Sequence, residues 1–494
     1  LLARFNLLCC NLQEEFLYRC RMWKYPYKTE PYEHQRNALQ QSAEKVHWAY
    51  FMEMGTGKTK VTIDNISYLY LKQDINSALI IAPKSVYTIW ENEIKTHMPD
   101  EVEREIFKWN IDKNYEKFQK SNKLKIFCVN VEALSTKRGF EGCVKYLKAN
   151  KKNMVVLDES TTIKNKGAKR TKQILSLRSL TYKRRILTGS PITKSPLDLY
   201  TQCEFLDQEL LGFSSFVAFR NRYAEMGEIQ VGSGRFISVP KYYKRLDELE
   251  TRLRQFSTRT RKDQCLDLKP KIRQKRYILL EGEQLKIYNQ LRVRALAVIE
   301  DKTISFSNKL SEIIKLHQVC NGYAKNDEGE IIKFKNPKLQ VLKDIIEETD
   351  NKIIIWANYI YNIKEIINFL KITYGEKSVV SIYGEVNVEE RSRAIDLFQN
   401  DSKVRFFVGN PSTGGFGLTL TSANTVVYYS NNYNLEIRMQ SEDRAHRMGQ
   451  KGSVVYIDIM AKDTIDEKIM KSLVKKGEVA AKTLGEEDLK SWVL

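Results

Sequence analysis

The sequence predicts an α/β protein of two lobes, each built on a parallel sheet with helices on its faces. The chain has 494 residues, more than one hydrophobic core of ordinary size can organise. Short Ile- and Val-rich runs recur along it, each followed by Gly, Ser or Thr and then by a longer amphipathic segment. This pattern is typical of buried parallel strands alternating with helices. The runs form two groups separated by a stretch that lacks them, so we expect two sheets.

The strand-like runs can be placed one by one. The first group comprises ALIIAP (78–83), KIFCVN (125–130), NMVVLDES (153–160) and RRILTGS (184–190). The second group comprises KIIIWANY (352–359), SVVSIYGE (378–385), VRFFVGN (404–410), TVVYYS (425–430) and SVVYIDIMA (453–461). Because ligands of open α/β sheets bind where the strands end, the polar residues after these runs are the candidates for chemistry.

The segments around these runs suggest a division of the chain. The stretch from about 197 to 335 reads as mainly helical, CLDLKPK (265–271) is the best candidate for a linker, and 463–485 predicts a closing helix packed on one lobe. The first residue is Leu1, which is consistent with a fragment or a processed product. The expected units are a helical extension (1–29), a first lobe (30–268) with a helical protrusion at about 197–262, a second lobe (269–485) with a helical protrusion at about 280–335, and a tail (486–494).

The composition favours a polyanionic partner. The chain has 81 Lys and Arg against 61 Asp and Glu, a formal charge of +20, which favours nucleic acid over a neutral solute. The basic residues concentrate in two stripes: 151–190 has eleven Lys or Arg against two acids, and 241–276 has thirteen against five. The 8 cysteines and 5 histidines show no zinc-ligand spacing, and no apolar run is long enough to span a membrane.

A glycine-rich turn predicts a phosphate-binding loop. Glycines allow backbone N–H groups to point at phosphate oxygens, and the helix that follows adds its positive end. Lys58 would neutralise the β- and γ-phosphates, and the Thr59 hydroxyl would bind Mg²⁺. Met52 occupies the place of the first glycine of the longer form of this motif, so we expect the shorter G-x-G-K-T variant, with a chance turn as the alternative. The loop residues are Gly55, Thr56, Gly57, Lys58 and Thr59.

An acidic pair at the end of a strand strengthens this interpretation. Asp158 and Glu159 end the run VVLDES, where an aspartate can hold Mg²⁺ and a glutamate can activate the water that attacks the γ-phosphate. The alternative is a pair that caps the following helix. Found about a hundred residues after a phosphate loop, the pair favours an ATPase.

Residues at both ends of the chain complete the predicted nucleotide site. Tyr32 and Gln35 precede the loop and offer an aromatic face and an amide to an adenine, although a surface turn is the plainer interpretation. Gln440, Arg444 and Arg447 lie in MQSEDRAHRMGQ, with the arginines at i and i+3 of an expected helix. Guanidinium groups suit the charge that develops on a transferring phosphoryl group. We therefore expect ATP to bind between the two lobes.

Taken together, these segments resemble the motifs of helicase superfamily two, and specifically those of the SWI/SNF-type (SNF2-like) DNA translocases. The resemblance covers residues from about 30 to 485 and implies two RecA-like lobes. It rests on PYEHQ (31–35), MEMGTGKT (52–59), IIAPKSVYTIWENEI (80–94), VVLDESTTIKN (155–165), RRILTGSPI (184–192), KIIIWANY (352–359), IYGEVNVEERSRAIDLFQN (382–400), GNPSTGGFGLTLTSANTVVYYSNNYN (409–434) and QSEDRAHRMGQ (440–450).

The resemblance implies roles for individual residues. Lys58 and Thr59 match the phosphate-loop residues, Asp158 and Glu159 the acidic pair, and Gln35 the adenine reader. Arg444 and Arg447 match the arginine fingers, and Gly417 lies in the motif that couples nucleotide to DNA. The implied contacts to the DNA backbone, which would not read sequence, are Lys84, Ser85, Lys164, Asn165, Thr188, Ser190, Ser412, Thr413 and Thr419.

Three features depart from the family pattern. Ser160 follows the acidic pair where many members have another residue that links the nucleotide to the neighbouring motif, and Ser430 stands where an acid is usual. The roughly 160 residues between SPI and KIIIW are few for this subfamily, and no bromodomain-, chromodomain- or zinc-like addition is visible in the sequence. We therefore expect a motor without appended modules.

The sequence thus predicts an enzyme, an ATP-dependent translocase on double-stranded DNA that uses ATP and Mg²⁺, acts as a monomer and does not necessarily unwind the duplex. The alternatives are a strand-separating helicase in recombination or repair, the motor subunit of a restriction or defence complex, and a DNA-binding scaffold with an inactive ATPase. The richness in Lys, Asn, Ile and Tyr favours a bacterial or phage origin. The expected location is therefore cytoplasmic, or nuclear if the source is eukaryotic.

Overall fold

The computed structural model describes residues 25–84, 86–87, 89–231, 235–265, 268–300, 306–325, 330–414 and 418–485. Most of the expected N-terminal extension (1–29), the whole tail (486–494), Ser85 and Gly417 lie outside the described residues.

The first lobe is built on a seven-stranded parallel sheet with the strand order β3-β4-β2-β5-β6-β1-β9. Its strands are β1 (His47–Met52), β2 (Ser77–Ala82), β3 (Arg104–Lys108), β4 (Leu124–Asn130), β5 (Asn153–Asp158), β6 (Lys183–Leu187) and β9 (Ser257–Thr260). The four strands predicted for this half are confirmed as β2, β4, β5 and β6. Alternate residues of the central strands enter two separate hydrophobic clusters, one on each face of the sheet.

The second lobe has a six-stranded parallel sheet with the order β10-β17-β16-β13-β15-β14. Its strands are β10 (Ile272–Ile278), β13 (Lys352–Trp356), β14 (Val379–Ile382), β15 (Phe406–Gly409), β16 (Ala423–Tyr428) and β17 (Val455–Ala461). All five predicted strands are confirmed. Ile353 and Ile355 face one cluster while Ile354 and Trp356 face another, so both faces of this sheet are also buried.

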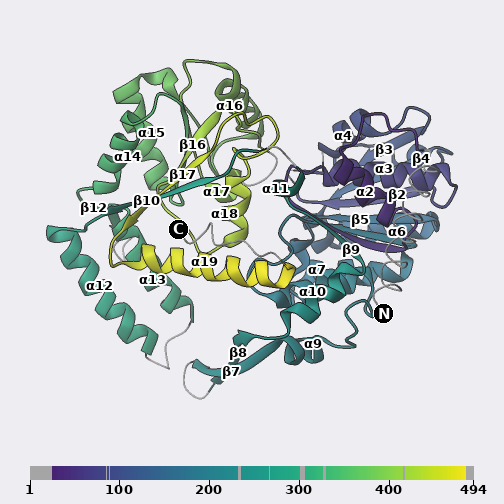
Figure 1. Cartoon of the computed structure of the whole chain (residues 1–494), viewed down its shortest axis with the longest axis horizontal. Coiled ribbons are helices and arrows are strands. Elements are labelled where there is room, and N and C mark those ends of the chain that lie inside the picture. Colours follow the sequence, from purple (N-terminus) through teal and green to yellow (C-terminus); the bar gives the residue numbers. More distant parts are fainter. Residues whose placement is uncertain are drawn as a thin grey trace, which may run out of the picture.

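Helices cover both sheets (Figure 1). Those before the crossing between lobes are α2 (Glu33–Ser42), α3 (Lys58–Leu71), α4 (Ile89–His97), α5 (Tyr115–Gln119), α6 (Lys137–Ala149), α7 (Lys169–Ser176), α8 (Leu199–Leu206), α9 (Phe216–Tyr223), α10 (Leu246–Arg254) and α11 (Lys262–Cys265). Those after it are α12 (Gly282–Glu300), α13 (Phe306–Cys320), α14 (Pro337–Glu347), α15 (Ile360–Tyr374), α16 (Val388–Asn400), α17 (Pro411–Gly414), α18 (Leu435–Glu442) and α19 (Ile465–Leu484). Within the described ranges, none is both long and apolar enough to cross a membrane.

The segment between the two groups of strands is only partly helical, contrary to expectation. The chain leaves the first sheet at Thr260 and enters the second at Ile272, so the crossing includes the predicted linker. The expected helical protrusion at about 197–262 also contains the antiparallel hairpin β7 (Ala224–Val231) and β8 (Arg235–Tyr243) and the sheet strand β9. The expected protrusion at about 280–335 ends in a short hairpin, β11 (Tyr323–Lys325) and β12 (Ile331–Lys333).

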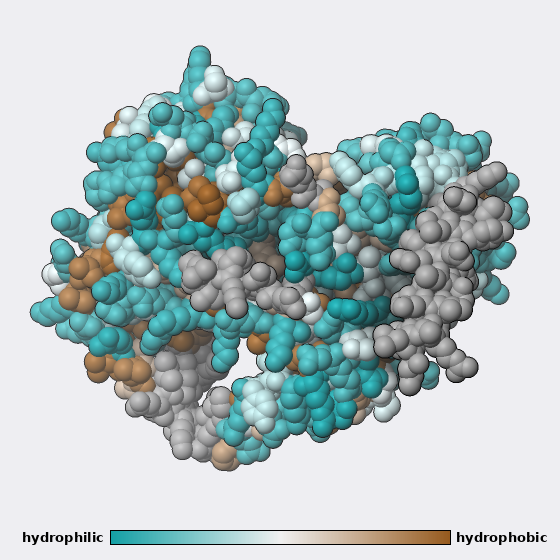
Figure 2. All heavy atoms as spheres, in the orientation of Figure 1, coloured by the Kyte–Doolittle hydropathy of each residue, from teal (hydrophilic) through white to brown (hydrophobic). Residues whose placement is uncertain are grey.

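The face seen in Figure 2 is largely hydrophilic, with hydrophobic residues gathered mainly over the second lobe. The free thiols of the described residues are mostly buried. Four of the five free cysteines recorded in the described chain are buried, namely Cys128, Cys143, Cys203 and Cys320.

Helix α19 joins the two lobes, which corrects the prediction that it packs on one. Its first half carries Ile469 and Leu473 into the core of the second lobe. Its second half carries Ala480 into the main core of the first lobe, where Leu484 also packs. In Figure 1 the helix runs from the second lobe to α10 of the first. The helix therefore acts as a strut between the lobes.

Replacing Ala480 with Glu tests the strut. Ala480 is 8% exposed, and a carboxylate placed in this apolar contact without a partner costs several kcal/mol unless the two surfaces part. We expect the radius of gyration from small-angle X-ray scattering to increase. Glu478→Ala, on the exposed side of the same turn, should leave it unchanged. Equal radii for both variants would contradict the role of α19.

Candidate functional site

The phosphate loop is a tight turn between β1 and α3. Gly55 has φ of 86° and Gly57 has φ of 92°, a left-handed conformation that favours glycine. A Cβ added at Gly57 would also lie 2.2 Å from Nε2 of Gln35. Both constraints explain why the loop needs glycine at position 57. The close approach of Gln35 also shows that α2 packs directly against the loop.

Lys58 begins α3 and is nearly buried, with 9% of its surface exposed. Its Nζ donates to the backbone oxygen of Glu53 at 3.4 Å, an oxygen that also accepts the Thr56 hydroxyl at 2.7 Å. Burial lowers the pKa of Lys58, and the nearby carboxylates of Glu159 and Asp158 oppose this shift. The lysine thus faces the acidic pair.

The acidic pair lies where β5 ends. Asp158 accepts the Trp90 indole N–H at 3.0 Å on one oxygen and the backbone N–H of Glu159 at 3.0 Å on the other. Glu159 has φ of 48° and its side chain makes no capping bond to the 3₁₀ turn that follows, which disfavours the alternative of a helix cap. Burial raises the pKa of Glu159 to about 7; Lys58 opposes this shift and Asp158 adds to it. Burial also raises the pKa of Asp158.

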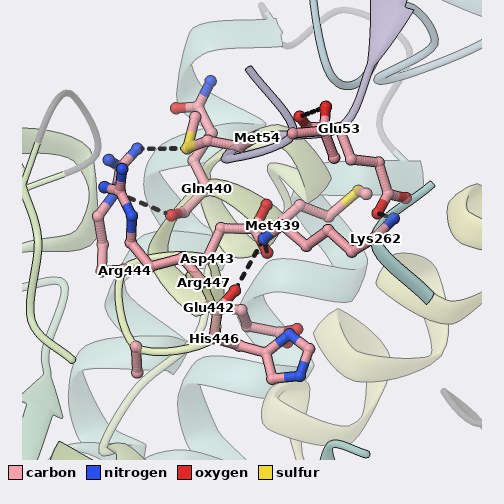
Figure 3. A network of polar contacts seen from close by, with 12 residues as sticks. Glu53, Met54, Lys262, Met439, Gln440, Glu442, Asp443, Arg444, His446 and Arg447 are labelled. Carbon is pink, nitrogen blue, oxygen red and sulfur yellow. Dashed lines mark hydrogen bonds and ion pairs between the residues drawn. The ribbon is translucent and has the colours of Figure 1, made fainter. Parts of the chain in front are cut away.

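The two predicted arginine fingers come from the second lobe and reach the first. They lie in the turns after α18, not on one face of a helix as expected. Arg444 is 1% exposed, donates to the backbone oxygens of Gln440 and Leu418, and contacts Sδ of Met54 at 2.9 Å across the lobe boundary (Figure 3). Burial lowers the pKa of Arg444 to about 10, and the adjacent Arg447 adds to this shift.

Arg447 also faces the phosphate loop. Its NH1 donates to the oxygen of Leu418 at 3.2 Å. Its Cβ lies 3.6 Å from the position that a Cβ on Gly55 would occupy. The side chain is therefore at the boundary between the lobes on the side of Lys58.

One cavity of about 540 Å³ is lined by both lobes and collects most of the predicted nucleotide site. Its walls include the loop, the acidic pair, both arginines, Trp90 and Met448. The predicted residues that line it are Tyr32, Gln35, Gly55, Gly57, Lys58, Thr59, Asp158, Glu159, Arg444 and Arg447, with Thr419 from the predicted DNA contacts.

Two predicted nucleotide residues lie outside this cavity. Thr56 is buried and its hydroxyl and backbone N–H both bind the oxygen of Glu53, so it stabilises the loop. Gln440 lines a neighbouring cavity of about 280 Å³ between the lobes. Its backbone oxygen accepts from Arg444.

The predicted adenine residues are tied to the loop. Gln35 accepts the backbone N–H of Tyr32 at 3.1 Å and donates to the oxygen of Thr56 at 3.1 Å. His34, which sequence reasoning missed, contacts the same oxygen at 2.8 Å and stacks on the Tyr32 ring. Tyr32 is 48% exposed and its hydroxyl contacts Sδ of Met448 in the second lobe at 3.4 Å. Sequence offered no signal for His34 beyond its place in PYEHQ.

The residues predicted to contact DNA fall into two sets. Lys84, Asn165 and Ser412 are exposed, and Thr413 is half-buried. Thr188 and Thr419 are instead placed beside the nucleotide residues: Thr188 is 1% exposed and donates to a carboxylate oxygen of Glu159 at 3.4 Å. Ser190 contacts Sδ of Met439 across the lobe boundary. Thr188 and Ser190 are thus not part of an open surface in this conformation.

Lys164, the last of the described residues predicted to contact DNA, forms an ion pair with the second lobe. Its Nζ donates to Glu436 Oε2 at 2.8 Å, and the Thr161 hydroxyl donates to Glu436 Oε1 at 2.7 Å. Glu436 lies in the first turn of α18. An anion that approached Lys164 would therefore compete with this carboxylate.

The two residues that depart from the family pattern have structural partners. The Ser160 hydroxyl donates to Oε1 of Gln202 at 2.7 Å. Ser430 Oγ accepts the backbone N–H of Asn358 at 2.9 Å. Each serine thus stabilises the lobe to which it belongs, Ser160 the first and Ser430 the second.

The donor set at the cavity suits a hard divalent cation. Thr59 offers a hydroxyl and Asp158 a carboxylate, and oxygen ligands of this kind bind Mg²⁺ through one or two protein groups while phosphates and water supply the rest. Among the described residues no group of three or more His, Cys, Asp or Glu forms a cage for a metal ion. A magnesium ion held partly by a bound nucleotide fits this arrangement.

Two parallel-sheet lobes that share one cavity, with a phosphate loop on one side and two arginines on the other, define a two-lobed nucleotide-binding protein. Residues 49–324 match the model of the SNF2-related domain, and residues 337–449 match that of the helicase conserved C-terminal domain. The chain belongs to the SNF2-related family.

Curated relatives agree with this family. An "uncharacterized ATP-dependent helicase" of Mycoplasma pneumoniae is 29% identical over 88% of the chain and 40% of its own length. A "putative ATP-dependent helicase/translocase" of Bacillus subtilis is 28% identical over 84% of the chain and 44% of its own length. The chain thus spans less than half the length of these relatives.

A solved structure, the SWI2/SNF2 ATPase core of Sulfolobus solfataricus in complex with double-stranded DNA, is 25% identical and aligns over 96% of both chains with a TM-score of 0.43.

Replacing Glu436 with Gln should make Lys164 available to an anionic partner, and duplex DNA serves as the probe of its affinity. The change removes the partner of Lys164 but keeps the shape of the side chain, and a partly exposed ion pair is worth up to about 1 kcal/mol, so a gain of about two- to fivefold is expected. Fluorescence anisotropy at fixed salt measures it. Glu389→Gln removes the same charge from an exposed site on α16. An equal gain in both variants would show that only net charge matters.

Proposed function

We propose that the protein hydrolyses ATP in the cavity between its lobes and uses the energy to move along double-stranded DNA, without necessarily separating the strands. The observation that carries the proposal is the shared cavity, where Lys58 and Glu159 of one lobe face Arg444 and Arg447 of the other. A site divided in this way lets hydrolysis change how the lobes sit relative to each other. The family and the names of the bacterial relatives support the same conclusion.

Each residue of the cavity has a distinct task in this proposal. The loop N–H groups and Lys58 bind the β- and γ-phosphates. Glu159 orients the attacking water and accepts its proton; its raised pKa of about 7 places it near the operating pH. Arg444 and Arg447 stabilise the negative charge that develops on the transferring phosphoryl group, and their burial strengthens that interaction.

Magnesium completes this site in the proposal, held by Thr59 and Asp158. When bound, the ion neutralises charge on the β- and γ-phosphate oxygens. The Trp90 indole N–H fixes the Asp158 carboxylate at 3.0 Å and so orients it toward the cavity. Trp90 is thus a positioning residue that sequence reasoning did not assign.

The proposed partner is the phosphate backbone of duplex DNA. The basic stripes at 151–190 and 241–276 supply excess positive charge, and Lys84 is exposed for such a contact. Binding through phosphates is tolerant of sequence and falls steeply as salt rises. The coupling of Thr188 to Glu159 would link the DNA grip to the hydrolytic site.

Strand separation is the second candidate, and one observation keeps it in view. The hairpin β7–β8 stands away from both sheets (Figure 1), and its stem exposes Phe236 at 60% and Tyr242 at 57%. Exposed aromatic rings can stack on unpaired bases.

The inactive-scaffold alternative is disfavoured because Lys58, Asp158, Glu159 and Arg447 are all present and line one cavity.

Two further expectations stay proposals. The bacterial relatives favour a cytoplasmic location in a bacterial cell. We also propose that the motor works as a monomer, because the nucleotide cavity is completed by two lobes of the same chain. A role as the motor subunit of a larger defence assembly is compatible with both.

Two substitutions separate nucleotide binding from hydrolysis. Lys58→Ala removes the phosphate-binding charge and should abolish ATP turnover. Glu159→Gln keeps the shape of the side chain but removes the base, so ATP should still bind while hydrolysis falls by at least about a hundredfold. Phosphate release and binding of a fluorescent ATP analogue provide the measurements. Normal turnover in either variant would refute the assignment of the site.

The nucleic-acid partner is tested by comparing activators. ATP turnover should be stimulated by blunt duplex DNA more than by single-stranded DNA or RNA, and the protein should displace the third strand of a triplex. The apparent affinity for duplex should drop by about a thousandfold or more between 50 and 200 mM salt if six or more phosphates are contacted. Stimulation by single strands alone would favour the strand-separating alternative.

A further inference from the structure

One lysine contacts the residue that directly precedes each of the two arginines. Lys262 begins α11 and is 4% exposed. Its Nζ donates to Asp443 Oδ1 at 2.7 Å and to the backbone oxygen of His446 at 2.8 Å (Figure 3). Asp443 precedes Arg444 and His446 precedes Arg447, so one ammonium group fixes the turn from which both guanidinium groups extend.

The other end of this lysine is fixed to the phosphate loop. Its backbone N–H donates to Oε2 of Glu53 at 3.0 Å, and Arg259 pairs with Oε1 of the same carboxylate. Glu53 directly follows β1, and its backbone oxygen accepts Lys58 Nζ. Lys262 thus connects the segment that carries the loop to the turn that carries the arginines.

The neighbouring charges do not duplicate this connection. Lys271 and Arg273, just before and within β10 of the second sheet, pair with Glu442, and Lys271 also lies 3.6 Å from Asp443 Oδ1. Both belong to the second lobe, so they brace α18 and the start of its turn without reaching the first lobe. Lys262 follows β9, a strand of the first sheet. The contact between Arg444 and Sδ of Met54 in the first lobe involves one of the two guanidinium groups, whereas Lys262 holds the turn that carries both.

We propose that Lys262 is a positioning residue that sets where Arg444 and Arg447 meet the nucleotide, so that turnover depends on its charge. This inference rests on the proposed ATPase function. It assigns Lys262 no contact with the nucleotide: the lysine lines the neighbouring cavity of about 280 Å³ and not the one that holds the phosphate loop. Its loss should lower kcat rather than affinity for ATP.

The charge of this lysine is sensitive to pH. The titratable groups that face it are the carboxylates of Asp443 and Glu53, the ammonium group of Lys271 and the imidazole of His446, whose pKa burial lowers. Burial lowers the pKa of Lys262 to about 8, with Asp443 opposing the shift and Lys271 adding to it. Protonation is complete below this pKa and is lost as pH rises through it, so the grip on Asp443 weakens on the alkaline side.

The first test measures kcat and the affinity for a fluorescent ATP analogue in the intact chain with saturating duplex DNA. Lys262→Met should lower kcat by about tenfold or more, with nucleotide affinity changed less than about twofold. Lys183→Met is the matched control. Lys183, the first residue of β6, is also nearly buried, and it forms an ion pair with Asp74. The control substitution should lower thermal stability while keeping kcat.

The second test separates positioning from mere structural support. Asp443→Asn should lower kcat in the same way, and the double variant with Lys262→Met should be no slower than the worse single variant. The wild-type kcat should fall as pH rises through about 8, and Lys262→Arg, which keeps its charge, should restore turnover and remove that fall.

The outcomes distinguish the two proposals. No DNA-stimulated turnover in the wild type would contradict the proposed function. Wild-type turnover together with undiminished kcat in Lys262→Met or Asp443→Asn, or a loss that appears only in nucleotide affinity, would overturn the role of Lys262. If Lys262→Met fails to fold, Asp443→Asn and the pH profile of Lys262→Arg decide the question.

Discussion

The arrangement of the lobes depends on buried charges at their boundary, each of which must be paired. Lys262 of the first lobe pairs with Asp443 of the second at 2.7 Å, and Lys271 lies 3.6 Å from the same carboxylate oxygen. Burial alone would raise the pKa of Asp443, but these two lysines hold it below its usual value. A buried ion without a partner costs several kcal/mol, so such a network tolerates few relative positions of its members. Paired buried charges of this kind favour discrete arrangements of two lobes over a continuous range.

The sequence predicted the interior of the fold because interior strands are defined by composition. Each central strand is buried on both faces, so Ile and Val fill it without alternation, and all nine predicted strands are present. Strands β3, β9 and β10 were missed because they lie at sheet edges and carry charged residues, as in RQKR of β10. The central strand β1 was also missed, because its sequence HWAYFM contains no Ile or Val. The prediction that α19 packs on one lobe was wrong, because one continuous apolar stripe does not reveal that the two halves of the helix face different lobes.

The nucleotide site was more predictable than the DNA surface for a physical reason. Phosphate binding uses a short local turn, so Gly57 and Lys58 identify it from residue type and spacing. Contacts to DNA depend on how the lobes close, and sequence does not encode that directly. Thr188 and Lys164 illustrate the difference, since the first bonds to Glu159 and the second to Glu436 of the other lobe.

These two contacts connect the site of hydrolysis to the cleft between the lobes. Glu436 and Met439 lie on α18, and the turn that follows α18 carries Arg444 and Arg447. Lys164 and Ser190 contact α18 from the first lobe, so an anion that draws Lys164 away from Glu436 frees one side of this helix. The arginines move with the helix unless the boundary network holds them. In the proposed function, charge on the DNA backbone and charge on the nucleotide would act on opposite ends of one short segment, which would then couple the two binding events.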